Sequence, residues 1–565
     1  MNKKPPSIKP NLYQGLLMRK IFISLWSLSI AGIIIRLLCA SSTIGSYDQD
    51  IDTFIYLGSQ LLKGKLIYIH NFDPKLPTVQ YIFAPVALFK SITAHRWIAF
   101  FYNVIGAICV YLGIKNLSNS DLLPKARNYD LAATGAGTLF ILLSQKIIGG
   151  LSGHIHTYSN TFLAIAFLCV TLAERSQSAG KKNITSPQIK WKYNFYWLLA
   201  GATTSIAISI RPNLIFPCLF SGIIIASLHS YQAKSLPIKT SAFFIIGSFL
   251  ASIAIFSPYF FISDGLSIAW HGAIIAPAEW IRSDNKHNPN FLEAFQWIMN
   301  ARAGGVSGWM LSTAALPGLL LAISRQAFRP SYLNYRRIIL PITTVIYILG
   351  LAYSFTHKNL WWHYQLMGAL PLTIIAVTGL IHLNSSSDKR LYRLSAIFAL
   401  ILSMILAYDI FVVEARDFVS NQNSSISKSS DQTVIKDLDK VLTFLKKLPV
   451  EDRQFTSPAN FRLHWETGVS STSTGAHPQW SLSAYDMKES KTTQILQLAT
   501  TEKIACSQLT NPINNYLILD EFNPKAVTRE LFENCLQKSD LQWVEISSNL
   551  NLKSNKVRVY KQASK

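Results

Sequence analysis

Residues 46–81 read SYDQDIDTFIYLGSQLLKGKLIYIHNFDPKLPTVQY, an acidic and partly polar stretch between two long apolar runs. Three carboxylates, Asp48, Asp50 and Asp52, stand together near its start. Ionisable side chains held at a membrane boundary usually serve a bound ion or a reaction. We therefore expect the chemistry of this chain in this loop, with a helical membrane fold around it.

The composition also indicates a membrane protein. Half of the 565 residues (50%) are hydrophobic and only 15% are charged, whereas soluble domains carry about a quarter charged residues. Apolar segments of about 20 residues are long enough to cross a bilayer. We expect spans near 20–40, 96–116, 129–148, 241–263, 308–324, 338–355, 364–382 and 392–412, with weaker candidates at 79–94, 160–175, 195–210 and 213–229.

The distribution of the net charge of +23 indicates a membrane topology rather than binding to nucleic acid. Lysine and arginine gather in short connections, which the positive-inside rule places in the cytoplasm. These connections are residues 1–20, 175–192, 325–337 and 389–393, and the loops 41–78, 264–306 and 356–363 then face outward. Twelve membrane-spanning segments would return the region after about residue 413 to the cytoplasm, so we expect 11 or 13. Segment 79–94 would then be re-entrant or wrongly divided. This predicts a multi-pass protein of the plasma (inner) membrane, with residues 1–19 cytoplasmic and residues 20–412 forming the helical domain.

The composition changes after the last apolar run. Residues 413–432 include a linker rich in serine and asparagine. Residues 433–565 read as an extracytoplasmic α/β domain with a helix at 434–448 and short buried strands at YLILDEF, WVEIS and KVRVY. Its cysteines, Cys506 and Cys535, either form a disulfide, as an oxidising compartment allows, or remain two unpaired thiols.

The first outer loop has the pattern of a short amphipathic helix. Phe54, Leu57 and Leu61 recur at helical spacing after Asp52, an expected N-cap, and Gly64 suits the left-handed residue beyond the helix end. Asp50 would then lie just before a helix resting on the membrane surface. Farther on, FDPKLP leads Lys75 towards the next apolar segment, where a lysine can meet a lipid phosphate.

The order of these elements resembles the GT-C membrane glycosyltransferases. It is similar to the branch of the protein O-mannosyltransferases, the lipid A aminoarabinose transferase and the rhizobial lipopolysaccharide core glycosyltransferases. The matching pattern is an acidic residue, a short helix that ends in glycine, a tyrosine and an Asp-x-Lys-x-Pro element. In this chain it falls on Asp50, Gly64, Tyr68, Asp73, Lys75 and Pro77. Two later segments also resemble the family, RPN at 211–213 and WWHYQLMGALP at 361–371. The chain departs from it at Ile51 and His70, where the family often has acidic residues, which leaves the base open among Asp48, Asp50 and Asp52; we favour Asp50.

The resemblance implies a transfer of sugar from a polyprenyl-phosphate or polyprenyl-diphosphate donor, with inversion, to a glycan, lipid or protein acceptor on the outer face. A carboxylate can take the proton from the acceptor hydroxyl, and fixed cations can stabilise the departing phosphate. We expect Lys75, Arg211, His363 and Tyr364 at the donor phosphate. Further substrate contacts are expected from Tyr68, Asp73, Trp280, Arg282 and His287.

The metal question is open from sequence. Asp48-Gln49-Asp50 matches a D-x-D motif, and oxygen ligands would suit Mg²⁺ or Mn²⁺. The branch that this chain resembles generally works without an obligatory metal, so we expect no obligatory cofactor and assign no metal ligand. His154 and His156 could bind a metal or sugar hydroxyls.

Other readings compete with this one. The acidic cluster can be a solvated turn, Lys75 a lysine that snorkels to the interface, and Arg211 a structural residue at a helix end. A polysaccharide polymerase or ligase would place its key arginines and histidines in the central outer loop 264–306. A transporter would call for midplane charges or an internal repeat, and we find no repeat.

Overall fold

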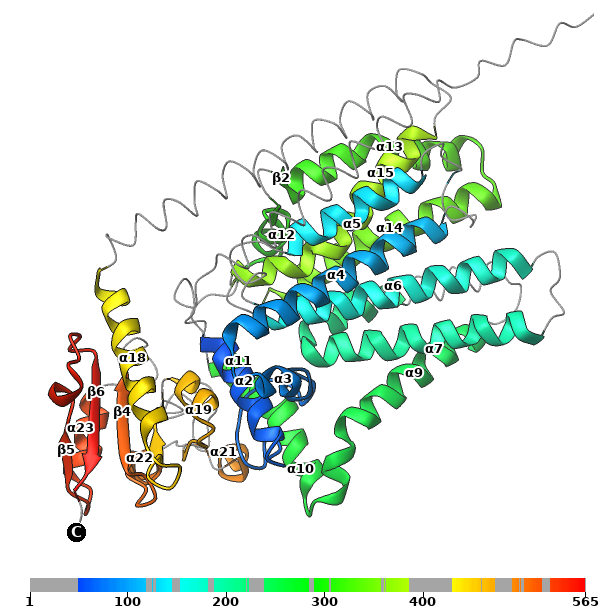
Figure 1. Cartoon of the computed structure of the whole chain (residues 1–565). Coiled ribbons are helices and arrows are strands. Elements are labelled where there is room, and N and C mark those ends of the chain that lie inside the picture. The colour runs from blue at the N-terminus through cyan, green and yellow to red at the C-terminus, as the bar shows by residue number, and fades with distance from the viewer. Residues whose placement is uncertain are drawn as a thin grey trace, which may run out of the picture.

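The computed structural model shows a long helical bundle with a small α/β domain at one end (Figure 1). It describes residues 49–117, 124, 129–144, 153–180, 187–219, 221–222, 238–283, 289–303, 306–356, 360, 362–385, 429–458, 460–472, 490–496, 498, 502–520 and 529–563. The expected spans 20–40 and 392–412, and residues 220 and 223–229 of the weaker candidate 213–229, lie outside these residues.

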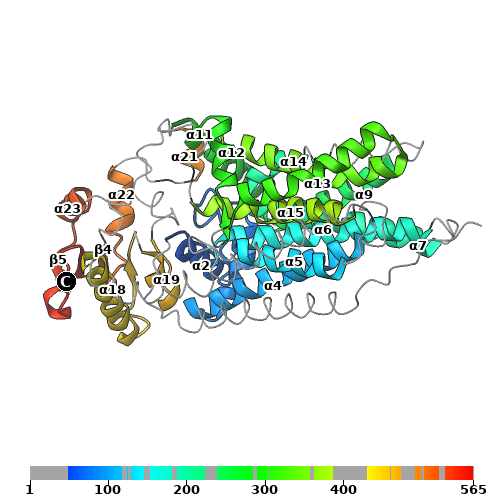
Figure 2. The same cartoon turned by 90° about the horizontal axis from the view of Figure 1, so that it is seen from above.

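The bundle consists of eight of the described helices, which run side by side in both views (Figures 1 and 2). They are α4 (Ile92–Leu117), α5 (Tyr129–Ser144), α6 (Ile155–Gly180), α7 (Pro187–Ile210), α9 (Ile238–Phe256), α13 (Gly308–Phe328), α14 (Tyr332–Ser354) and α15 (Ala369–Asn384). Glycines allow close packing: a Cβ on Gly201 of α7 would collide with the backbone of Phe244 on α9.

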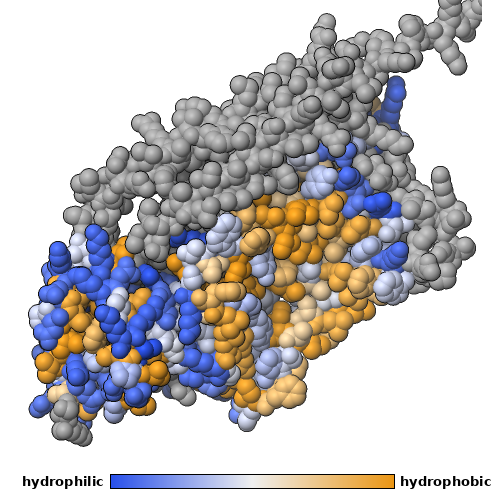
Figure 3. Space-filling model, in the orientation of Figure 1, coloured by the Kyte–Doolittle hydropathy of each residue, from blue (hydrophilic) through white to orange (hydrophobic). Residues whose placement is uncertain are grey.

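Five described segments are long and apolar enough to cross a membrane. They are Ile92–Leu117, Ile155–Ser176, Thr240–Phe261, Arg337–Ser354 and Tyr364–Leu383. The last of these is almost completely enclosed by its neighbours, whereas Thr240–Phe261 is largely exposed at the bundle surface. Hydrophobic residues predominate on the coloured part of the bundle face, whereas the C-terminal domain shows many hydrophilic residues among fewer hydrophobic ones (Figure 3), which is compatible with a helical membrane protein that has a water-exposed domain.

The segment expected at 79–94 is divided into two helices. The helix α3 (Thr78–Leu88) has 11 residues, and at about 1.5 Å per residue it is too short to cross a hydrocarbon core of about 30 Å. The chain then turns at Lys90, which has a left-handed φ of 45°, and α4 begins at Ile92. The total number of passes stays a prediction.

The C-terminal domain is built on a four-stranded sheet of order β3-β4-β6-β5. Its strands are β3 (Phe455–Thr456), β4 (Tyr516–Asp520), β5 (Trp543–Glu545) and β6 (Val557–Gln562); β3 and β4 are parallel and the other pairs antiparallel. Ile518 faces α18 (Ser429–Lys447) in one apolar cluster, and Leu517 faces α22 (Glu502–Leu509) and α23 (Arg529–Gln537) in another. Because β4 is buried on both faces, its sequence reads as a continuous apolar run.

The three strands expected from sequence are present as β4, β5 and β6. The expectation that all three are buried was wrong for β5, which lies at the edge of the sheet with Val544 55% exposed. The two-residue β3 was not predicted. The helix expected at 434–448 begins earlier, at Ser429, inside the expected linker. Cys506 of α22 and Cys535 of α23 form a disulfide, with their Cα atoms 4.9 Å apart. This bond staples the two helices that cover one face of the sheet.

Candidate functional site

The helix α2 (Gln49–Leu61) carries the acidic residues of the first loop and lies between the bundle and the C-terminal domain (Figures 1 and 2). It begins at Gln49, so the expectation that Asp52 is an N-cap was wrong: Asp50 and Asp52 both lie in the first helical turn. Carboxylates are favourable there because they face the positive end of the helix dipole. Asp48 lies outside the described residues.

The helix is held firmly in place by α3. Phe54 and Leu57 are fully buried on its apolar face, and Gly58 packs so closely on α3 that a Cβ would collide with the Phe83 carbonyl group. Beyond the helix end, Gly64 takes the expected left-handed conformation, with φ at 75°. Asp50 is therefore mounted on a rigid helix.

The carboxylate of Asp50 meets a buried histidine from the loop before α6. Its Oδ2 lies 3.3 Å from Nε2 of His154, whose side chain is only 1% exposed, whereas that of Asp50 is 31% exposed. The Phe54 ring lies edge-on to the His154 ring, with centroids 6.0 Å apart. From the sequence, His154 was expected only as a ligand of a metal or a sugar, because no local pattern links it to Asp50 across 104 positions.

A buried cation lies behind this pair. Arg211 stands directly after α7, and its guanidinium contacts the His156 ring nitrogens at 2.6 Å and packs over the Tyr364 ring, with its Cζ 5.0 Å from the centroid. The His154 and His156 rings are themselves 4.6 Å apart. Burial lowers the pKa of the Arg211 guanidinium, while Tyr364, Asp50 and then Asp73 act to raise it, so both carboxylates stabilise its charge.

The segment after α2 adds a second acid and a lysine. Asp73 is fully buried; its Oδ1 accepts a hydrogen bond of 2.9 Å from the Lys75 backbone N–H, and its Oδ2 has no hydrogen-bond partner among the described residues. The Nζ of Lys75 lies 6.0 Å from the centroid of the Phe54 ring. Lys75 and His154 therefore both approach the Phe54 ring, one turn along α2 from Asp50.

Tyr68 fixes the shape of this segment. Its φ of 70° is left-handed, and its hydroxyl donates a hydrogen bond to the Lys75 carbonyl oxygen. Burial raises the pKa of the Tyr68 phenol well above its usual value, and Tyr259 and Asp73 add to the effect. The hydroxyl thus stays a donor, and Tyr68 orders the backbone that carries Lys75.

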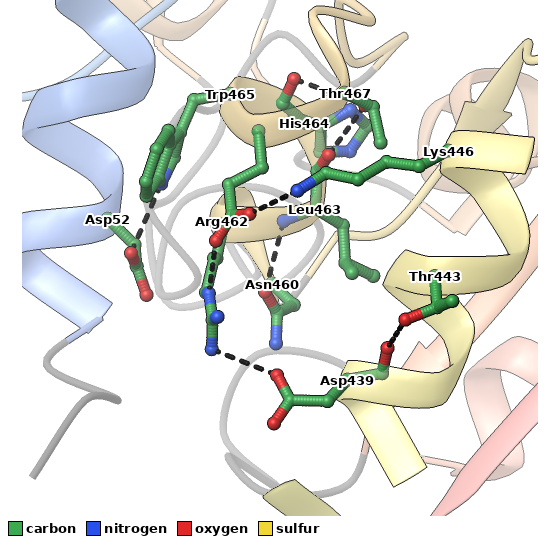
Figure 4. Close-up of polar contacts among 11 residues, drawn as sticks. Asp52, Asp439, Thr443, Lys446, Asn460, Arg462, Leu463, His464, Trp465 and Thr467 are labelled. Carbon is green, nitrogen blue, oxygen red and sulfur yellow. Dashed lines mark hydrogen bonds and ion pairs between the residues drawn. The ribbon is translucent and has the colours of Figure 1, made fainter. Parts of the chain in front are cut away.

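Asp52 faces a different environment from Asp50. It is 4% exposed, and its Oδ1 accepts a hydrogen bond of 3.1 Å from Nε1 of Trp465, on α19 (Phe461–Thr467) of the C-terminal domain (Figure 4). Ser471 N donates to the Tyr56 hydroxyl at 3.0 Å, and Tyr56 packs on the Phe461 ring at 5.0 Å between centroids. Of the two described acids on α2, Asp52 belongs to the domain interface and Asp50 to the His154 and Arg211 cluster.

The central outer loop is joined to the same domain. Glu279 on α11 (Ala276–Ser283) accepts hydrogen bonds from Ser490 and Thr492, at 3.1 and 3.2 Å, beside α21 (Lys491–Ile495). Glu279 was not among the predicted residues. Trp280 and Arg282 lie on α11 and His363 on η4 (Trp362–Gly368), but their side chains are not among those described, and His287 lies outside the described residues.

Within the described part of the chain, no group of three or more histidine, cysteine, aspartate or glutamate side chains is arranged to hold a metal ion. The sequence was also compared with protein-family models and with curated proteins, and neither comparison finds a match. The function must therefore be argued from the geometry of the site.

Proposed function

We propose that this chain is an integral membrane glycosyltransferase. It would move a sugar from a polyprenyl-phosphate or polyprenyl-diphosphate donor to an extracytoplasmic glycan, lipid or protein, with inversion at the anomeric carbon. The observation that carries the proposal is a partly exposed carboxylate, Asp50, on a rigid helix at the end of an apolar bundle, beside the buried cation Arg211. A base and a phosphate-directed cation are the two groups that such a transfer needs.

Asp50 serves as the general base in this proposal. It removes the proton of the acceptor hydroxyl as that oxygen forms a bond to the anomeric carbon and the bond from that carbon to the donor phosphate oxygen breaks. The contact at 3.3 Å with His154 orients the carboxylate. Since Asp50 is more exposed than its partner, an acceptor arriving from the water side would meet the carboxylate first.

Arg211 and Lys75 would neutralise the charge that develops on the leaving phosphate. A guanidinium in a water-poor site stabilises an anion more strongly than the same group in water. The contact of the Arg211 guanidinium with the Tyr364 ring restrains this side chain, and a guanidinium can contact phosphate oxygens in a bidentate manner. No divalent ion is needed for this scheme, and retention of activity in a chelator would support that part of it.

The location of the domains supports an outward-facing site. The candidate site and the C-terminal domain lie at the same end of the bundle (Figure 1), and the domain carries the Cys506–Cys535 disulfide. Disulfides persist in oxidising compartments outside the cytoplasm. We therefore propose a plasma (inner) membrane protein with its N-terminus in the cytoplasm and its C-terminal domain outside.

The proposal is tested by transfer of radiolabelled sugar from polyprenyl-phosphate donors in membranes that contain the wild type, Asp50→Asn or the matched control Asp540→Asn. Loss of a general base should lower transfer about 10²- to 10⁴-fold, with donor binding kept, while Asp540→Asn, on the C-terminal domain, transfers normally. Equal transfer by Asp50→Asn would remove it from the mechanism. No transfer from any donor by the wild type would contradict the glycosyltransferase and favour a polymerase, a ligase or a transporter.

A further inference from the structure

A second group of charged side chains lies at the other end of α2, away from Asp50. Lys63 and Lys65 flank Gly64 just beyond the helix, and Lys90 lies in the turn between α3 and α4. The 13 positions from Asp50 to Lys63 correspond to about 20 Å along a helix. These three residues, the lysine cluster, are therefore separate from the candidate site.

The three ammonium groups converge on one short segment of the C-terminal domain. The Nζ of Lys63 donates to the Gly468 carbonyl oxygen at 2.5 Å and to the Ser470 hydroxyl at 3.3 Å, and the Nζ of Lys65 reaches the same hydroxyl at 3.1 Å. The Nζ of Lys90 lies 3.8 Å from the place where a Cβ on Gly468 would stand. Three positive charges thus surround residues 468–470.

The backbone holds this arrangement. Gly64, with φ at 75°, turns the chain back so that the Lys63 and Lys65 amides both donate to the Gln60 carbonyl oxygen, at 3.0 and 2.9 Å. Lys90 has a φ of 45°, a left-handed conformation that is unfavourable for a residue other than glycine. The lysines are presented from ordered turns rather than from a loose tail.

No carboxylate of the described residues forms an ion pair with these lysines. Burial lowers the pKa of the Lys63 ammonium, and the neighbouring charges of Lys65 and Lys90 lower it further. Like charges repel each other in the unbound protein, and an anion that binds among them reduces this repulsion. The cluster is thus built to receive negative charge.

The surroundings indicate what carries that charge. Leu62 is 48% exposed beside Lys63, and Leu88 and Phe89 are 66% and 62% exposed beside Lys90. An apolar side chain next to an exposed lysine is the arrangement of membrane interfaces, where the apolar group enters the acyl region and the ammonium stays at the headgroups. We propose that the lysine cluster binds the phosphate of an anionic membrane lipid, outside the candidate site and independently of the proposed transfer reaction.

Binding is measured on the full-length chain in a neutral detergent, by thermophoresis during titration with dioctanoyl phosphatidylglycerol. The variant Lys63→Gln/Lys65→Gln/Lys90→Gln should bind it at least 10-fold more weakly than the wild type, and the affinity of the wild type should fall as salt rises. The matched control Lys436→Gln/Lys553→Gln/Lys561→Gln removes the same charge from exposed positions of the C-terminal domain and should bind like the wild type.

Further arms identify the ligand and guard against misfolding. Replacing the three lysines with arginine keeps the charge and should keep binding, which a folding defect of the glutamine variant cannot imitate. Dioctanoyl phosphatidylcholine should bind at least 10-fold more weakly than the anionic lipid. Unchanged binding by the glutamine variant, equal binding of the neutral lipid, or inorganic phosphate binding as tightly as phosphatidylglycerol would each overturn the proposal.

Discussion

The indole Nε1 of Trp465 donates a hydrogen bond to the Asp52 carboxylate at 3.1 Å, across 413 positions of the chain. Both side chains are almost completely buried. The contact lies on the helix that carries Asp50, and Phe461 and Trp465 share one apolar cluster with Ile51 and Phe54. The C-terminal domain is therefore part of the structure that holds the candidate base in position.

Replacing Trp465 with phenylalanine should loosen α2. It removes a hydrogen bond to a buried carboxylate, an interaction of about 1.5–3 kcal/mol, and we expect hydrogen exchange of α2 amides to accelerate and sugar transfer to fall. The measurements are exchange mass spectrometry of residues 51–61 and the transfer assay. Trp543→Phe makes the same chemical change on β5 and should leave α2 unchanged; α2 exchange in Trp465→Phe like that of the wild type would argue against this role.

Replacing His154 with glutamine should lower kcat for transfer about 10- to 100-fold. The histidine orients the base without contacting the donor phosphate, so the donor KM should stay within about 2-fold. Steady-state kinetics across pH 5–9 would separate these effects, because loss of a group coupled to the base alters the pH profile as well as the rate. A change in the donor KM alone would mean that His154 belongs to the donor site.

Arg211 should not be replaceable by lysine. A lysine keeps the positive charge but loses the planar contacts with His156 and Tyr364, and we expect Arg211→Lys to lower kcat/KM for the donor about 10²-fold. The comparison is Arg175→Lys, 20 positions along α6 from its first residue, Ile155, which corresponds to about 30 Å from the end of the helix that adjoins His154; activity should be retained in this variant. Full activity in Arg211→Lys would leave the arginine with a packing role.

His464 should make the C-terminal domain less stable in acid. It is fully buried, its Nε2 accepts a hydrogen bond from Ser457 N at 3.1 Å, and burial lowers its pKa to about 3. The unfolded chain, with a histidine pKa near 6.5, binds an additional proton between these two values. This contribution is therefore complete above about pH 6.5 and is lost as the pH falls, by about 1.4 kcal/mol per unit.

Thermal unfolding of the full chain between pH 7 and 5, followed by tryptophan fluorescence, measures this dependence. His464→Gln cannot take up the proton and should show a shallower decline of Tm with pH than the wild type. Parallel declines in the two proteins would show that other groups dominate the acid response.

Removing the disulfide should destabilise the C-terminal domain more than removing a lone thiol. The cysteines are separated by 29 positions, for which the loop-entropy model gives about 3–4 kcal/mol. Cys506→Ser/Cys535→Ser should therefore unfold at a lower temperature than the control Cys218→Ser, which alters a free cysteine. Dithiothreitol should lower the unfolding temperature of the wild type but not that of the double variant.

Local patterns predicted much of the fold. Alternation and apolar runs located β4, β5 and β6, and the left-handed turn at Gly64 followed from the residue type. The start of α2 was misplaced because aspartate suits both an N-cap and a first turn. The two-residue strand β3 is too short to leave a periodic signal.

The contacts of the candidate site could not be predicted from local sequence patterns. Asp50 meets His154, Asp52 meets Trp465 and Glu279 meets Thr492 through packing between distant segments, and one sequence carries no record of such proximity. His154 and His156 were singled out from the sequence, but their position beside Asp50 and Arg211 was not predicted. Separating Asp50 from Asp52 required knowing which of them faces the C-terminal domain.

The bond between Trp465 and Asp52 also sets an order of assembly. Because 413 positions separate them, and ribosomes add about 5–20 residues per second, the helix with the acidic residues leaves the ribosome some 20–80 seconds before its partner exists. During that interval α2 can pack only on neighbours such as α3. In a nascent chain α2 therefore lacks its contact with α19 until the C-terminal domain has been synthesised, and under the proposed function we expect sugar transfer only after that contact has formed.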